Sequence, residues 1–354
     1  MHSHGSQFEW AQVCALAIAL DLCVGSGAQA QEFSLLAGSV DAVESSQHSY
    51  AWSFEFREPL TQHLDVTLGY LNEGHPRDHH RDGINTQLWI GDTLAKDRLR
   101  VGLGLGAYRF FDTATAPGYE SVNVHGWGLM TSLTAAWRLS ADLSARVSVN
   151  HVAAKESVDF TTYLVGCGWK LKDASLFGTH HTGSSPRRTT PGREILGFAG
   201  IAIVNTFRSE QSVAWGVEYR RGIGRTWDWT VSWINEGDPE GDLGPSNRHG
   251  IATQVWMVTP LDRERFALGI GIGPYLFRDR KRPTIDPGSS EHGVSLIVTG
   301  TLCYRLGERR QYRLNWNRVV SNYHRDSDVI VIGYGVRWPS GSAAGGLNPT
   351  PLHR

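Results

Sequence analysis

The residues of this chain with the clearest chemical potential are histidines. His75, Asp78, His79 and His80 fall in one short polar segment. Imidazole and carboxylate groups together are common ligands of zinc, so this segment could hold a metal ion. A loop whose polar side chains face water explains the same residues with fewer assumptions. We therefore predict no metal site and no cofactor.

Two further histidines could act in catalysis. His125 and His292 each precede a glycine, and a histidine can serve as a general base near neutral pH. A histidine at the rim of the fold, packed beside its glycine, is the simpler interpretation. No nucleophile paired with a base can be recognised. We assign no catalytic residue and favour a protein that is not an enzyme, with an enzyme kept open.

A basic segment offers a different chemistry, the binding of anions. It comprises Arg278, Arg280, Lys281 and Arg282. Guanidinium groups bind phosphate through strong charge-assisted hydrogen bonds, so these residues are candidates for contact with lipopolysaccharide, and a solvated loop is the alternative. The whole chain has a formal net charge of −1, which gives no argument for nucleic acid as a partner.

The elements that position these residues occur twice, because the chain contains an internal repeat. Residues 52–169 and 215–336 carry the same landmarks in the same order, at an offset of 163 (215 − 52) that becomes 167 (271 − 104). A longer loop in the second copy explains the change. The repeated landmarks include Asn72-Glu73-Gly74 with Asn235-Glu236-Gly237, Gly104-x-Gly106-x-Tyr108 with Gly271-x-Gly273-x-Tyr275, and His125-Gly126 with His292-Gly293. Each copy is therefore one structural unit of a larger fold.

Each copy reads as a series of eight β-strands. Apolar and polar residues alternate with period two: Trp52 and Phe54 fall on one face, and Glu55 and Arg57 on the other. Segments of about ten residues can cross a bilayer when tilted, and long and short links alternate as in outer-membrane barrels. The sequence predicts an all-β, transmembrane antiparallel barrel of about sixteen strands made of two eight-strand repeats. A soluble sandwich or closed soluble barrel is the alternative.

The polar face of these strands should line the interior of the barrel, because the apolar face must meet lipid. The residues expected to line the lumen are Glu55, Arg57, Asp65, Gln87, Arg138, Arg146, Asn150, Glu218, Arg220, Gln254, Arg305 and Asn317.

Segments outside the repeats have their own signals. The apolar run at residues 13–24 and Ala28-Gln29-Ala30 fit a signal peptide, although no Lys or Arg precedes the run. Cys167 and Cys303 remain after cleavage and are expected to be free thiols. The predicted divisions are a signal peptide at 1–30, barrel repeat 1 at 31–171, a periplasmic linker at 172–194, barrel repeat 2 at 195–338 and a flexible tail at 339–354.

Across residues 31–338 the chain resembles the outer-membrane β-barrel proteins of Gram-negative bacteria. Gly333-Tyr334-Gly335-Val336-Arg337-Trp338 is similar to the aromatic-terminated last strand of that class, although a tail of 16 residues (354 − 338) follows it. This resemblance implies an outer-membrane location, contact with lipid and lipopolysaccharide, and the barrel assembly machinery as a partner.

A local resemblance points to the lipid A 3-O-deacylases. It rests on Asn317-Arg318-Val319-Val320-Ser321-Asn322, which lacks the histidine of the family's pattern. The first copy has His151 but Ala153 and Ala154 in the serine region. Neither copy holds both parts of the catalytic pattern.

Two architectures fit the duplication. A single sixteen-stranded barrel would enclose an aqueous channel, whereas two tandem eight-stranded barrels would each be filled by their own side chains. We predict the single barrel because tandem membrane barrels are rare, although the long central linker favours two. The corresponding function is a porin-like passive pore or export channel for small solutes or glycan. The alternatives are an envelope-modifying enzyme of the deacylase type and a plugged structural barrel that binds a periplasmic partner through the linker.

Overall fold

The computed structural model describes residues 31–43, 47–76, 79–116, 119–155, 157–171, 192–206, 209–223, 227–238, 247–260, 265–279, 292–307, 309–321 and 325–338. Eight antiparallel strands come from each copy, as the duplication predicts. The first eight are β1 (Gln31–Ala42), β2 (His48–Pro59), β3 (Leu64–Asn72), β4 (His79–Leu94), β5 (Leu99–Ala116), β6 (Tyr119–Arg138), β7 (Leu143–Ala154) and β8 (Phe160–Leu171). The second eight are β9 (Arg193–Val204), β10 (Gln211–Gly222), β11 (Trp227–Asn235), β12 (His249–Pro260), β13 (Phe266–Arg278), β14 (His292–Leu306), β15 (Arg310–Val320) and β16 (Ser327–Trp338).

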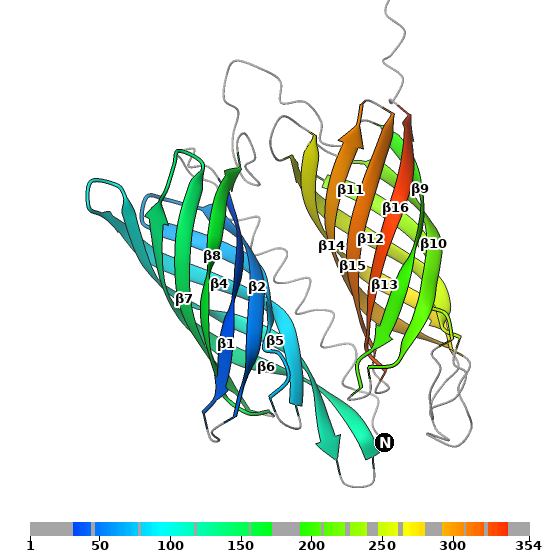
Figure 1. Cartoon of the computed structure of the whole chain (residues 1–354), viewed down its shortest axis with the longest axis horizontal. Coiled ribbons are helices and arrows are strands. Elements are labelled where there is room, and N and C mark those ends of the chain that lie inside the picture. Colours follow the sequence, from blue (N-terminus) through cyan, green and yellow to red (C-terminus); the bar gives the residue numbers. More distant parts are fainter. Residues whose placement is uncertain are drawn as a thin grey trace, which may run out of the picture. The chain divides into compact units, whose positions relative to one another are not determined.

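The strands form two closed barrels, so the predicted single sixteen-stranded barrel is wrong and the tandem alternative is correct (Figure 1). β1 pairs with β8 along its whole length, from Gln31↔Leu171 to Ala42↔Phe160. β9 pairs with β16 in the same way, from Arg193↔Trp338 to Val204↔Ser327. Once both edges of each eight-strand sheet are paired, neither sheet has a free edge for the other to join. The two barrels are called barrel 1 and barrel 2 below.

The chain divides into two compact units at residues 1–185 and 186–354, a boundary within the predicted linker. The predicted signal peptide, residues 172–191 of the linker and the predicted tail lie outside the described residues, so these assignments stay predictions. Cys167 and Cys303 are free thiols in different barrels.

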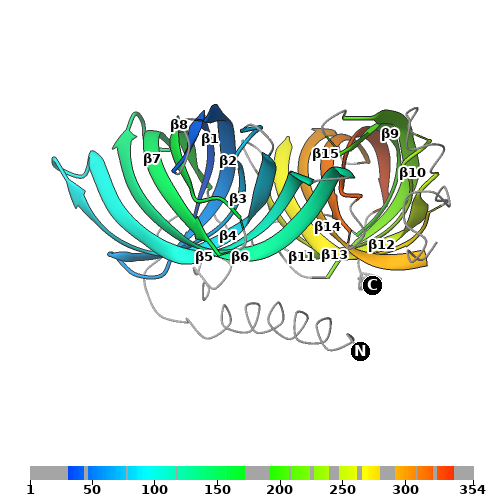
Figure 2. The same cartoon turned by 90° about the horizontal axis from the view of Figure 1, so that it is seen from below.

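The alternation of the sequence decides which side chains point into each barrel. On β2, Ala51, Ser53 and Glu55 are buried, whereas Tyr50 on the other face is exposed. β9 and β16 show the same alternation along most of their length, because successive residues of a strand point to opposite faces. The interior of each barrel is therefore assembled from every second residue of eight strands, which wrap around a common axis (Figure 2).

Barrel 1 differs from barrel 2 in one long hairpin. β5 and β6 are 18 and 20 residues long, whereas their counterparts β13 and β14 have 13 and 15. β6 pairs with β7 from Gly128 onward, so its first part pairs with β5 and extends past the end of β7. The hairpin projects from the end of the barrel at which the odd-numbered strands finish (Figure 1).

Candidate functional site: the charged interior of each barrel

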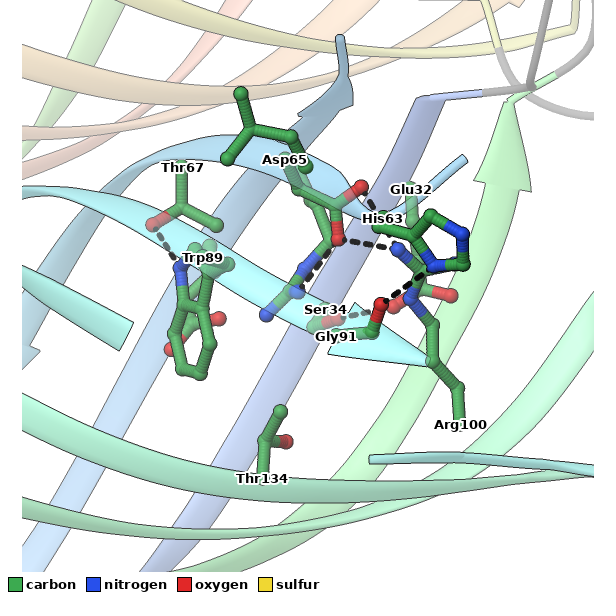
Figure 3. Close-up of polar contacts among 12 residues, drawn as sticks. Glu32, Ser34, His63, Asp65, Thr67, Trp89, Gly91, Arg100 and Thr134 are labelled. Atoms are coloured by element: carbon green, nitrogen blue, oxygen red, sulfur yellow. Dashed lines mark hydrogen bonds and ion pairs between the residues drawn. The ribbon is translucent and has the colours of Figure 1, made fainter. Parts of the chain in front are cut away.

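A layer of paired charges lies inside barrel 1, near the end where the chain enters β1. Register places Arg57 of β2 opposite Thr67 of β3, so Asp65 is its diagonal neighbour on the inner face. Arg57 donates an Nη1 hydrogen bond to Asp65 at 3.0 Å, and Arg100 of β5 reaches the same carboxylate at 2.9 Å. Figure 3 shows Arg100 pointing toward Asp65. Two cations therefore share one buried carboxylate.

A second ion pair crosses the same lumen. Arg146 of β7 lies 2.8 Å from Glu55 of β2 and 3.8 Å from Glu32 of β1. Its other nitrogen atoms donate to the Thr134 and Ser34 hydroxyl groups at 2.9 and 3.0 Å. The guanidinium and the Glu55 carboxylate are almost inaccessible to water, with side-chain exposures of 1% and 2%. Charges buried this deeply require a partner of opposite sign.

Trp89 of β4 covers this layer. Its Nε1 atom donates to the Thr67 hydroxyl at 2.9 Å (Figure 3). The Arg57 guanidinium lies 4.3 Å from the ring centroid in a cation–π contact. A Cβ atom on Gly104, its register partner on β5, would lie 2.9 Å from the ring. The glycine therefore makes room for an inward-facing tryptophan.

Barrel 2 repeats the arrangement around its own tryptophan. Arg220 donates to Asp228 at 2.8 Å and lies 5.0 Å from the Trp256 ring centroid. Trp256 donates to the Thr230 hydroxyl at 2.8 Å. Ala267 stands where barrel 1 has Arg100. The arginine, carboxylate, threonine and tryptophan thus form the same unit in both barrels.

The cross-lumen ion pair is also duplicated. Arg313 of β15 is paired with Glu218 and lies 3.4 Å from Glu194. Ser232 donates to Glu218 at 3.0 Å, and Gln311 donates to Glu194 at 2.7 Å. As in barrel 1, one arginine holds two carboxylates that come from the first two strands of its barrel.

A second charged layer lies toward the opposite end of each barrel. In barrel 1, Arg81 is paired with Glu73, which also accepts a hydrogen bond from the Tyr108 hydroxyl at 3.1 Å. In barrel 2, Arg248 donates to Glu236 at 2.7 Å, and the Ser327 hydroxyl donates to Glu236 at 2.7 Å. These carboxylates belong to the repeated Asn-Glu-Gly landmark.

Around this layer the two rims differ. Asp112 of barrel 1 contacts Nδ1 of His79 at 2.9 Å and accepts a hydrogen bond from the Ser157 hydroxyl at 2.6 Å. Asp279, the counterpart of Asp112, is paired with Arg325 at 2.5 Å. A histidine in one barrel is thus replaced by an arginine, a permanent cation, in the other.

Apolar side chains fill much of the remaining interior. In barrel 1 they include Leu36, Leu71, Tyr108, Phe110 and Met130, each at most 1% exposed. In barrel 2 the corresponding cluster is formed by Leu196, Ile234, Tyr275, Ile297 and Val319, among others. Charged and apolar layers together pack the interior as in the core of a small soluble protein.

The residues predicted to line a lumen occupy two kinds of position. Arg138 is exposed at a barrel end and Arg305 is half-buried. The others are buried inside the barrels and mostly engaged with one another: Glu55, Arg57, Asp65, Gln87, Arg146, Asn150, Glu218, Arg220, Gln254 and Asn317. Gln87 and Gln254, for example, donate to Ser132 and Thr299 at 2.8 Å.

Several interior residues were missed by the sequence reasoning. Arg313 is the counterpart of Arg146 at the offset of 167, and applying the offset to every inward arginine would have found it. The pairs Glu73–Arg81 and Glu236–Arg248 were also missed. Their signal was the Asn-Glu-Gly landmark itself, because a glutamate present in both copies needs a partner once it is buried.

The histidine segment forms no metal site among the residues that the structure describes. The rings of His75 and His80 lie 4.0 Å apart, and burial lowers the pKa of His75. Asp78 lies outside the described residues. His125 packs edge-on against Phe111 with ring centroids 5.5 Å apart, which matches a packed rim histidine. The side chain of His292 is not among those described.

Outer faces of both barrels are apolar. Exposed side chains include Leu103, Leu129 and Val165 of barrel 1 and Val213 and Ile332 of barrel 2. Apolar surface on this scale, wrapped around a closed barrel, is stable in lipid and not in water. Among the described residues no helix combines the length and hydrophobicity needed to span a bilayer.

Aromatic side chains mark the ends of this apolar surface. In barrel 1, Trp137 and Trp169 lie toward one end, and Tyr50 and Trp127 toward the other. Aromatic girdles at both interfaces are typical of outer-membrane barrels. The apolar outer face and these girdles place the protein in an outer membrane.

The comparisons with known proteins found matches among solved structures. No family model matches the chain, and no curated protein matches it. The N-terminal β-barrel domain of Pseudomonas aeruginosa OprF is 13% identical, with a TM-score of 0.33, over 40% of this chain and 97% of that one. Ail, the attachment invasion locus protein of Yersinia pestis, is 12% identical, with a TM-score of 0.30, over 40% of this chain and 99% of that one. The Ralstonia pickettii toluene transporter TbuX is 10% identical, with a TM-score of 0.24, over 88% of this chain and 90% of that one.

The predicted resemblance to outer-membrane β-barrel proteins is confirmed, and the barrels' own closure and outer faces carry that conclusion. The resemblance to lipid A deacylases is not shown. His151 contacts the Thr161 hydroxyl at 3.1 Å in barrel 1, whereas Ser321 hydrogen-bonds to Asp326 in barrel 2.

Proposed function

We propose that the chain is a structural outer-membrane protein made of two side-chain-filled barrels, with its interaction surfaces on the outside. The observation that supports this function most is the packed interior. The charged layer, the tryptophan and the apolar cluster follow one another along the inside of barrel 1, and barrel 2 has the same sequence of layers. A passive pore needs a continuous column of water, which these side chains occupy.

The energetics of buried charge support the same conclusion. An ion pair such as Arg313–Glu218, with side-chain exposures of 0% and 3%, is stable because its members are paired and hydrogen-bonded. Opening a path for solutes would require these groups to separate. Pairs of this kind suit a rigid wall better than a channel lining.

A channel for small solutes or glycan, predicted from the sequence, remains the second candidate. One observation favours it: Nε and Nη2 of Arg57, and Nε and Nη1 of Arg313, are buried without a hydrogen-bond partner among the described residues. Buried polar atoms of this kind are places where water binds. A chain of such water sites could carry small ions through a narrow path.

Reconstitution into planar bilayers separates the two functions. The full chain, folded in lipid and shown by heat-modifiable gel migration to be folded, should give no stable unitary conductance and no liposome swelling with small sugars. A porin of known pore size is the positive control. Stable conductance steps that persist in several preparations would overturn the filled-barrel function and select the channel.

The partners of the protein are proposals as well. The closing strand β16 ends in Trp338, and an aromatic-ended last strand is what we expect the barrel assembly machinery to bind. A periplasmic partner would bind through residues 172–194. Crosslinking from a photoreactive residue placed in that segment tests this partner in intact cells, with a residue in 280–291, which join β13 to β14 at the other end of the barrel, as the control.

A further inference from the structure

A groove crosses the outer face of barrel 2 near the end at which its odd-numbered strands finish. It has a volume of about 390 Å³ and lies on β11, β12, β13 and the start of β14. Strand register arranges its wall in two rows. Trp233, Ile251 and Leu276 are direct neighbours across three strands and form an apolar row. His249 and Arg278 are neighbours in the next row, closer to the barrel end.

Two glycines lie at inward-facing positions between the outward side chains of the groove. Gly250 and Gly293 line the groove. A Cβ atom on Gly293 would lie 2.5 Å from the Phe277 ring, which fills the barrel behind it. The rings of Tyr275 and Phe277 fill the space inside the barrel at these two glycines, so the floor of the groove is backbone supported by buried aromatic side chains.

Arg278 is exposed at the end of the groove and forms no ion pair with any residue in the described part of the chain. The nearest acid in sequence, Asp279, is already paired with Arg325. An apolar channel that opens onto an unneutralised guanidinium fits a ligand with a hydrocarbon chain and an anionic head group.

We infer that this groove is a binding site for one lipopolysaccharide molecule, with an acyl chain of lipid A along Trp233, Ile251 and Leu276 and a phosphate at Arg278 and His249. The inference rests on the proposed function, which places the interaction surfaces outside the barrels. The links after β11 and β13 are longer than those after the even-numbered strands, as the external loops of outer-membrane barrels are, so we place this end of barrel 2 in the outer leaflet, where lipopolysaccharide phosphates would meet the row of Arg278 and His249.

Barrel 1 offers a matched control, because the same positions carry different residues. Tyr70, Ile84 and Arg109 replace the apolar row, so a cation interrupts it. Asp82 and Phe111 replace His249 and Arg278, so the phosphate-binding pair is absent there. Arg109 lies 5.4 Å from the Trp127 ring centroid. This face should not select a phosphorylated lipid.

The test measures lipid retention by native mass spectrometry of the folded full chain, released from detergent with bisphosphorylated lipid A, dephosphorylated lipid A or phosphatidylglycerol as the probe. Wild-type protein should retain one bisphosphorylated lipid A and prefer it to both other lipids. Combining Arg278→Gln with His249→Gln should weaken that retention about tenfold. Leu276→Trp, which fills the groove from a lipid-facing position, should weaken it without removing charge. Arg109→Gln should leave it unchanged.

Three outcomes would overturn the inference. Equal retention of phosphatidylglycerol would make the groove an ordinary phospholipid contact. Equal loss in Arg109→Gln would make binding a general effect of surface charge. Unchanged retention in the groove variants would place the lipid elsewhere. Heat-modifiable migration of every variant shows that it folds, and bilayer conductance of the same samples reports on the filled interior independently of lipid binding.

Discussion

The two barrels agree in their interiors and differ at their rims. Inside, Arg57, Asp65 and Trp89 match Arg220, Asp228 and Trp256 in identity and in contacts. At the rim, Asp112 of barrel 1 contacts His79, whereas its counterpart in barrel 2, Asp279, is paired with Arg325. The difference teaches that closure of an eight-stranded barrel constrains the layers that cross its lumen more tightly than the contacts at its mouth, where water can replace a lost partner.

The largest expected effect comes from breaking the cross-lumen ion pairs. Arg313→Met leaves Glu218 and Glu194 buried without their main cation, and Arg146→Met does the same to Glu55 and also removes the cation beside the partly exposed Glu32. Each change should lower the free energy of unfolding of its own barrel by about 3–5 kcal/mol. Urea unfolding in lipid vesicles, followed by hydrogen exchange of peptides from each barrel, measures the two separately.

Arg138→Gln is the control for these variants, because Arg138 is exposed at a barrel end. It should change the free energy of unfolding by less than about 0.5 kcal/mol. If one cross-lumen variant lowers the free energy of unfolding much more than the other, the interiors of the two barrels are not equivalent.

Variants at the rims should lower the stability of the two barrels by different amounts. Arg325→Ala removes the arginine paired with Asp279, whose side chain is 0% exposed, and should destabilise barrel 2 by about 2–3 kcal/mol. His79→Ala leaves Asp112 with the Ser157 hydroxyl, so barrel 1 should lose about 1 kcal/mol. The same unfolding experiment measures both, and a larger cost for His79→Ala would contradict the proposed order.

Substitution of the buried tryptophan should destabilise each barrel to the same extent. Trp89→Phe and Trp256→Phe each remove one hydrogen bond to a threonine and weaken one cation–π contact. A loss of about 1–2 kcal/mol in each barrel is expected. Thr67→Val and Thr230→Val remove the acceptor alone and should each give part of that loss; no effect from either would mean that the ring is held by packing.

The smallest effect concerns pH at the rim of barrel 1. Burial lowers the pKa of His75 below its ordinary value of 6.5, because the charged imidazolium is less well solvated there. The neutral form therefore stabilises the folded state above pH 6.5, and this contribution is lost as the pH falls through the lowered pKa. Asp238 stands at the equivalent position of barrel 2. An NMR titration of the His75 ring should give a midpoint below 6.5, and a midpoint above it would contradict the assignment.

Strands, inward faces and class of the fold could be predicted from the sequence, because period-two alternation is a local property. Glu55 and Arg57, for example, are inward on β2 as their spacing from Trp52 and Phe54 indicates. The number of barrels could not be predicted in this way. A strand such as β8 presents the same inner and outer faces whether it pairs with β1 or with β9, so closure depends on pairing that the alternation does not encode.

The contacts between charged side chains inside the barrels were only partly predictable for a similar reason. Arg57 and Asp65 lie on adjacent strands joined by a short turn, so their contact follows from local register. Arg146 and Glu55 meet across the lumen, and that meeting depends on the diameter of the closed barrel. The segment Arg280-Lys281-Arg282 lies outside the described residues, so its predicted contact with lipopolysaccharide phosphates stays a prediction, whereas Arg278 lies at the exposed end of the groove.

Closure of β1 onto β8 has a consequence for biogenesis. Each barrel closes at a seam, where its first strand pairs with its last. In barrel 1 this last strand is β8, and more than half of the polypeptide follows its outward residue Trp169. Because each barrel closes with its own strands, one seam can be completed while the strands of the other barrel are still unpaired.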